Sequence, residues 1–202
     1  MNLFIISSFL ICSLAVYVGL KRTKSIEDKS NVEFWEREKK ANSTRKQPLT
    51  DLEYITIPDE LLQMRPKHIT DEINSYLLDL NDLSSYKIVN LTGLSNTDLK
   101  LKYGTANITI LSEYDFHYTN LVTLLQKLAE CLHENNEDLL AIQTLEFAIS
   151  TNTDISKSYY LLAELYNNVG TPEKISHLIE HAECIHSLLK NTIVQNLKAS
   201  GQ

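Results

Sequence analysis

The chain has 202 residues, enough for one domain with a linker and an anchoring segment. It contains only 5 Gly and 4 Pro, few for a β-rich fold with many tight turns, so the composition favours helices. The formal net charge of −7 argues against a nucleic-acid-binding protein, which ordinarily presents a basic face.

The apolar run from Leu3 to Leu20 has no charged residue and would extend about 27 Å as a helix, enough to cross a bilayer core. A cleaved signal peptide would carry its positive charges before the run, whereas Lys21, Arg22 and Lys24 follow it. The pattern therefore predicts an uncleaved transmembrane anchor over residues 1–20.

The distribution of charge predicts an orientation for this anchor. Residues 21–50 hold nine basic and five acidic side chains, and residues 51–202 hold 10 basic and 21 acidic ones. Basic residues that flank a span remain in the cytoplasm. We expect a single-pass cell-membrane protein with its N-terminus outside and its C-terminal domain in the cytoplasm. Lipid contacts would come from residues 3–20 and a basic collar of Lys21, Arg22 and Lys24.

Residues 21–67 read as a basic juxtamembrane linker with a short helix from Val32 to Ala41, where two Glu-first i,i+4 ion pairs are possible. Phe34 and Trp35 allow two interpretations: the helix lies on the membrane surface, or it stiffens the linker while Trp35 packs on the body. Tyr54–Ile57 is expected to be an extended strap along a helix.

The linker carries one resemblance. An apolar N-terminus is followed by Phe34-Trp-Glu-Arg-Glu-Lys-Lys-Ala-Asn-Ser-Thr-Arg-Lys46 and then by Asp51-Leu-Glu-Tyr-Ile-Thr-Ile-Pro58. This order resembles a group of uncharacterised single-pass membrane-anchored bacterial proteins. The resemblance implies no activity.

Residues 68–118 are predicted to form a helical capping region. Apolar residues recur at helical spacing from Asp71 to Leu83, and a capped helix is expected from about Asn96 to Gly104. For Asn107–Leu111 a short helix or a loop is favoured over a strand, because no partner strand is evident.

The strongest pattern is a 34-residue self-similarity between residues 119–152 and 153–186, followed by a C-terminal extension to residue 202. It predicts two helical hairpins with matching apolar positions and a matching turn at Asn136 and Gly170. The aligned pairs are Leu125 with Tyr159, Leu128 with Leu162, Ala129 with Ala163, Leu132 with Tyr166, Ala141 with Ile175, Leu145 with Ile179, and Ala148 with Ala182.

This period and these residue types resemble the tetratricopeptide repeat family, whose Trp–Leu–Gly–Tyr–Gly–Ala–Phe–Ala series is met by Tyr159, Leu162, Ala163, Tyr166, Gly170, Ile175, Ile179 and Ala182. The sequence departs from that series where Thr153 and Ser187 replace the closing Pro, and Ile175 is larger than the usual Ala. The predicted fold class is therefore all-α: an N-terminal transmembrane helix, a linker and a small helical-hairpin repeat domain.

The resemblance also implies a binding groove lined by the first helix of each pair. Carried over by position, its lining is Gln126, Glu130, His133, Tyr160, Glu164 and Asn167. The two glutamates would repel a carboxylate, so the expected partner is a neutral or basic protein or peptide.

No catalytic residue, metal site or cofactor is predicted, and the chain is not expected to be an enzyme. His177-Leu-Ile-Glu-His181 matches a zinc-protease motif, and Cys184 continues the same helical face. Only 21 residues follow His181, too few for the distant Glu ligand of that class. A solvated face is the simpler interpretation.

The function predicted from these patterns is a membrane-anchored protein–protein interaction scaffold that presents the repeat domain to the cytoplasm. Two alternatives stay open: a structural subunit whose anchor helix packs within a larger membrane complex, and, less favoured, a zinc-dependent hydrolase using His177 and His181.

Overall fold

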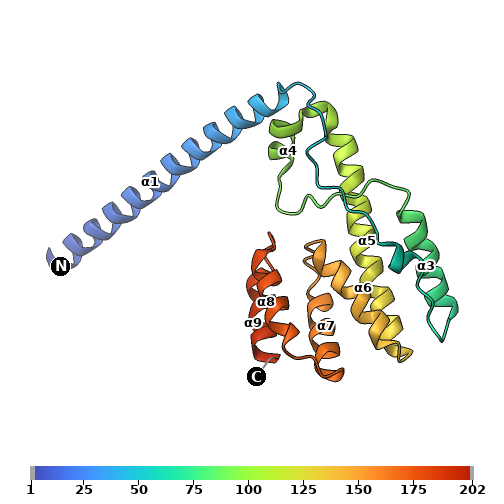
Figure 1. Ribbon diagram of the computed structural model, residues 1–202. Helices are drawn as coiled ribbons and strands as arrows, with labels where there is room; N and C mark the ends of the chain where they lie inside the picture. Colours follow the sequence, from blue (N-terminus) through green and yellow to red (C-terminus); the bar gives the residue numbers. More distant parts are fainter. Residues whose placement is uncertain (1–2, 201–202) are drawn as a thin grey trace. The chain divides into compact units, whose positions relative to one another are not determined.

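The computed structural model describes the backbone of residues 3–200, and their side chains except at 3–11, 15, 25–28, 30 and 200. Over this part of the chain all regular secondary structure is helical and no strand occurs, which confirms an all-helical fold (Figure 1). An isolated antiparallel bridge joins Tyr54 to Val89.

The predicted transmembrane anchor is wrong. Leu3–Leu20 belongs to a longer helix, α1 (Leu3–Asn42), which continues through the basic collar and the charged linker. Across the described residues, no helix combines the length and the apolar character needed to cross a membrane. The side chains of residues 1–11 and 15 lie outside the description.

This correction extends to the expectations built on the anchor. The single-pass cell-membrane localisation, with the N-terminus outside and the body in the cytoplasm, is contradicted by the same finding. The lipid contacts expected for residues 3–20, Lys21, Arg22 and Lys24 depended on that helix. The helix predicted from Val32 to Ala41 is the C-terminal part of α1 and not a separate element.

The chain divides into two compact units, residues 1–47 with 95–108, and residues 48–94 with 109–202. In the first unit, α4 (Asn96–Tyr103) packs against the C-terminal part of α1. Arg37 pairs with Asp98, and Lys100 pairs with Glu38. Trp35 is not part of the packing within this unit, where it is 66% exposed.

A close backbone approach ends α4 in this first unit. Gly104 has φ +84°, and a Cβ there would lie 2.3 Å from the carbonyl oxygen of Arg45. The Nδ2 of the buried Asn107 donates to the carbonyls of Gln47 (2.8 Å) and Tyr103 (2.7 Å). Only glycine fits where two backbones meet at this distance.

The second unit holds the helical hairpins. A 3₁₀ turn at Thr105–Asn107 precedes its longest helix, so Asn107–Leu111 leads into a 27-residue helix and is neither a loop nor a short helix. The helices of this unit are α2 (Asp59–Leu62), α3 (Asp71–Leu83), α5 (Ile108–Glu134), α6 (Asp138–Ser150), α7 (Ser156–Asn168), α8 (Lys174–Cys184) and α9 (Lys190–Ser200).

The helix ends repeat at the predicted interval. Helices α5 and α7 end 34 residues apart, as do α6 and α8, and the starts of α7 and α9 are separated by the same interval. The aligned apolar positions are buried in both hairpins, except that Ile179 is only partly buried. Ile193 of α9 is fully buried, 34 residues after Tyr159. The helix packing is therefore that of a helical repeat.

The two hairpin turns have the same backbone geometry. Asn136 has φ +61° and Gly170 has φ +77°. The amide of Glu137 donates to Leu132 (2.9 Å), and the amide of Thr171 donates to Tyr166 (2.8 Å), each to a carbonyl five residues back. This is the left-handed helix end that Gly and Asn permit at the lowest cost.

The extended segment and α3 cover the N-terminal side of the first hairpin. As predicted, Tyr54–Ile57 is extended: Ile55 N donates to Ile88 O (2.9 Å), and Ile57 enters the core. The Oε1 of the buried Glu137 accepts from the amides of Lys67 (2.6 Å) and His68 (3.2 Å). The loop before α3 is thereby tied to the turn between α5 and α6.

The equivalent turns predict opposite responses to substitution. Gly170→Ala should destabilise the fold by about 1 kcal/mol, because a β-carbon is strained at positive φ. Asn136→Gly should leave stability unchanged or raise it slightly, because it relieves the same strain. Urea unfolding followed by circular dichroism measures both. Equal losses in the two variants would show that the turns are not equivalent.

Candidate functional site

The six predicted groove residues lie on two neighbouring helices. Gln126, Glu130 and His133 are on α5, and Tyr160, Glu164 and Asn167 are on α7. Two contacts join these helices: the Ser158 hydroxyl donates to Gln126 Oε1 (2.5 Å), and Lys157 Nζ lies 3.6 Å from Glu130 Oε1. These contacts bring Gln126 and Glu130 against the first turn of α7. Within the described part of the chain, no hydrogen bond or ion pair joins either of them to Tyr160, Glu164 or Asn167.

Gln126 differs from the other five because it is buried between α5 and α7. Its Nε2 has no hydrogen-bond partner among the described residues. A buried amide with one end unsatisfied costs free energy, and its bond to Ser158 fixes the two helices in register. The structure gives this side chain a role in helix packing.

The remaining five groove residues are engaged to different degrees. His133 Nδ1 lies 2.6 Å from Asp138 Oδ1, and the Tyr160 hydroxyl accepts from Asn196 Nδ2 on α9 (2.7 Å). Glu164 and Asn167 are exposed near the end of α7. The accessible chemistry of this surface is therefore acidic and amide-like, centred on α7.

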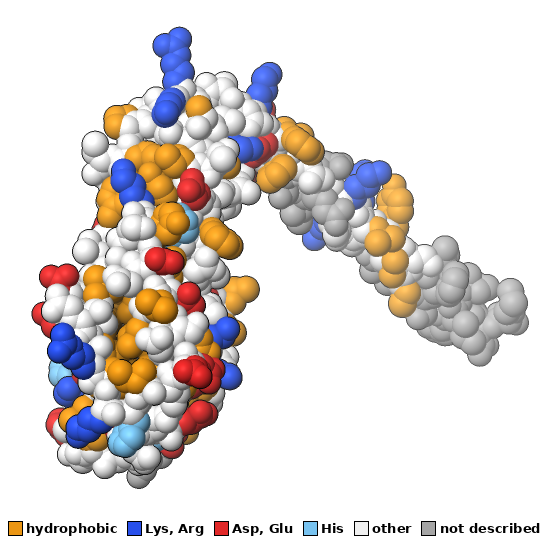
Figure 2. Space-filling view, turned by 90° about the vertical axis from the view of Figure 1, so that its right-hand side faces the viewer, with side chains coloured by type: hydrophobic (Ala, Val, Ile, Leu, Met, Phe, Trp, Pro, Cys, Tyr) orange, Lys and Arg blue, Asp and Glu red, His pale blue; other side chains and the backbone are white. Residues whose placement is uncertain are grey.

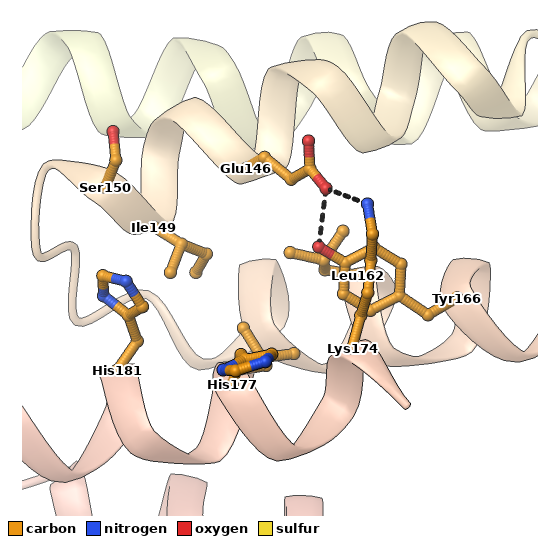
Figure 3. A pocket seen from close by; sticks show the side chains of 9 residues that line it. Glu146, Ile149, Ser150, Leu162, Tyr166, Lys174, His177 and His181 are labelled. Carbon is orange, nitrogen blue, oxygen red and sulfur yellow. Dashed lines mark hydrogen bonds and ion pairs between the residues drawn. The ribbon is translucent and has the colours of Figure 1, made fainter. Parts of the chain in front are cut away.

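A pocket of about 280 Å³ opens between α6, α7 and α8 (Figure 3). Its floor is apolar, formed by Ile149 of α6, Leu162 of α7 and Leu178 of α8, all buried. Its rim is polar. The rim residues are Glu146, Ser150, Tyr166, Lys174, His177 and His181.

Glu146 is the centre of the polar contacts at one end of this pocket. Its Oε1 accepts from the Tyr166 hydroxyl (2.8 Å) and from Lys174 Nζ (2.9 Å), and that ammonium also lies 5.2 Å from the centroid of the Tyr166 ring. Burial and the bond to Glu146 raise the pKa of Tyr166 above its ordinary value. The hydroxyl therefore remains a donor, and the carboxylate charge is largely compensated.

The two histidines of the zinc-protease-like motif stand at the other end. They lie one helical turn apart on α8, and His181 extends from α8 towards the C-terminal end of α6 (Figure 3). His177 Nδ1 lies 3.3 Å from Glu180 on the same helix, and Cys184 is exposed. Within the described part of the chain, no three His, Cys, Asp or Glu side chains are grouped so as to hold a metal ion.

Sequence reasoning did not find this pocket, because its walls come from three helices. The available signals were Glu146 at the position aligned with Glu180, and the spacing of His177 and His181. Neither shows that Glu146 meets Tyr166 and Lys174. That contact depends on how the second hairpin stacks on the first.

A second feature that the sequence did not reveal is an aromatic cluster around the extended segment. Lys87 Nζ lies 5.2 Å from the ring centroid of Tyr54 and 5.9 Å from that of Tyr114, and the Tyr86 ring lies 4.6 Å from His117. Figure 2 shows hydrophobic side chains in patches between charged ones. These contacts hold the extended segment on α5.

No family model, no curated protein and no solved structure matches the chain. The assignment as a helical repeat therefore rests on the 34-residue spacing of the helix ends, the buried positions and the turns of this chain.

The buried Gln126–Ser158 pair predicts a coupled response to substitution. Ser158→Ala should cost about 1–2 kcal/mol, because it leaves both ends of the Gln126 amide unsatisfied. Gln126→Met combined with Ser158→Ala should recover most of that loss, because no buried polar group then remains. Thermal and urea unfolding of the single and double variants measure the coupling. Additive losses would contradict the assigned packing role.

Proposed function

We propose that the second unit is a protein-binding module built like a tetratricopeptide array, whose partner is a neutral or basic protein segment. The observation that carries the proposal is the 34-residue register, which recurs in the helix ends, the buried positions and the turns. This is the period and the hairpin geometry of that repeat class.

Stacked hairpins of this kind bury their core between neighbours and leave extended surfaces for partners. The first helices of successive hairpins, α5 and α7, form one such surface, and α9 continues it through the Asn196–Tyr160 hydrogen bond. Side chains on this surface come from rigid helices, so a partner would meet a preorganised array.

Charge defines the expected partner. Glu130 and Glu164 occupy aligned positions on α5 and α7, and the ion pair of Glu130 with Lys157 is solvent-exposed and therefore weak. Glu164 is exposed near the end of α7. A lysine- or arginine-bearing segment complements these two carboxylates, whereas an acidic one would be repelled.

Reversing the charge at the proposed contact should weaken binding. A photo-crosslinking amino acid in place of Asn167 in the full chain is used to capture the partner. The partner is then purified, and its affinity for the uncrosslinked chain and its variants is measured by calorimetry. Glu164→Lys should lower the affinity about fivefold, corresponding to about 1 kcal/mol for one rim charge.

The matched control is Glu113→Lys, the same charge change at an exposed position in the N-terminal half of α5. It should change the affinity less than about twofold. If the two variants bind equally well, or if the partner is captured from position 113 and not from Asn167, the proposed surface is not the binding surface.

A further inference from the structure

Residues 88–94 follow α3 and cross the ends of two successive hairpins within the second unit. We infer that this segment is a conformational brace. It holds the turn before α7 at a fixed distance from the turn before α9, and it makes α8 and α9 unfold together with the helices that precede them. The brace acts without any partner.

The brace is first fixed on α5. The side chains of Ile88, Val89 and Leu91 are buried. The amide of Val89 donates to the carbonyl of Tyr114 (3.4 Å), and the amide of Leu91 donates to Asp115 Oδ1 (3.2 Å). Apolar burial and these two hydrogen bonds give the segment a defined path along α5.

Asn90 binds the turn before α7. Its Nδ2 donates to the carbonyls of Thr151 (3.0 Å) and Asn152 (3.3 Å) and to the hydroxyl of Tyr118 (2.9 Å). Carbonyls at the end of a helix lack a partner within it, and Asn90 supplies one at the end of α6. Burial raises the pKa of Tyr118 to about 12, so its hydroxyl stays neutral and donates to the Thr151 carbonyl as well (3.2 Å).

Gly93 meets the equivalent turn of the next repeat. It has φ +87°, and a Cβ there would lie 3.0 Å from His186 Cβ and 3.1 Å from the His186 carbonyl oxygen. His186 follows Asn152 by 34 residues, so the brace touches the same position in two successive repeats. Three residues of chain span at most about 10 Å, and packed helices lie about 8–10 Å apart. The chain between Asn90 and Gly93 therefore has little slack.

These contacts oppose the usual weakness of a repeat array. A terminal repeat packs on one neighbour only, so it opens more easily than the rest. Here the two turns are joined directly, because the Ser187 hydroxyl donates to Asp154 Oδ2 (2.8 Å), and they are joined a second time through the brace. Helices α8 and α9 can leave α7 only when the contacts of the brace at one turn are broken.

Native-state hydrogen exchange of the 202-residue chain, followed by mass spectrometry, tests the brace. In the unmodified chain the slowest amides of α7, α8 and α9 should exchange through one common opening. Gly93→Val should speed exchange in α8 and α9 about tenfold relative to α5, because its side chain meets His186 and is strained at positive φ.

The matched control is His186→Ala. It keeps the Cβ and the carbonyl that Gly93 approaches, and it removes only the imidazole of an exposed residue. Exchange in α8 and α9 should therefore change less than about twofold.

Asn90→Asp tests the other end of the brace with a side chain of the same shape. The carboxylate can still accept from the Thr92 amide, but it places an acceptor against the carbonyls of Thr151 and Asn152. It should also speed exchange in α8 and α9 about tenfold, although the hydrogen bonds of Asn90 reach only α5, the turn before α7 and its own segment.

Three outcomes would show that residues 88–94 are no brace. Faster exchange confined to this segment and the turns that it touches would reduce its role to local packing. An equal rise from α5 to α9 would show that α8 and α9 remain coupled without it. An unmodified chain in which α8 and α9 open before α7 would show that the coupling does not exist. None of these results bears on the Glu164 surface, whose test uses a partner protein.

Discussion

The second unit depends on the close approach of helices that cannot bury their apolar faces alone. Ala129 and Ala163 occur at the same place in successive hairpins, and both are buried to within 2%. Ala148 of α6 and Ala182 of α8 form a second pair of aligned positions, and both are fully buried. A methyl group at these points lets neighbouring helix backbones pack closely, and a larger residue would force them apart. Each hairpin is therefore stable only with its neighbour in place.

Such an array needs its two ends covered, and the chain uses different means at each end. On the N-terminal side, α3 and the extended segment supply Ile57, Ile73 and Leu80 to the core, while Glu137 binds two loop amides. On the C-terminal side, α9 begins one period after α7 and buries Ile193 and Leu197. The core therefore remains continuous from α3 to α9.

Sequence reasoning succeeded where the signal is local and periodic. The hairpins follow from apolar residues one period apart, and the turns follow because Asn136 and Gly170 tolerate a left-handed backbone. It failed for α1, where an apolar run and a charged linker form one helix, because hydropathy does not show where a helix ends. It also could not show that Gln126 is buried, since that depends on which side of α5 the neighbouring α7 covers.

The surface along α5 and α7 differs from the surface between α6 and α8. The difference depends on whether polar side chains of neighbouring helices meet along the whole contact or at one end only. Along α5 and α7, polar side chains find partners on adjacent first helices, as Gln126 does with Ser158 and Tyr160 with Asn196. These hydrogen bonds join neighbouring first helices, and the surface that remains is suited to polar and charged contacts. Between α6 and α8, Glu146 binds Lys174 and Tyr166 at one end only. The apolar floor beyond that end stays open, and a pocket forms where the second hairpin lacks a side chain large enough to fill it.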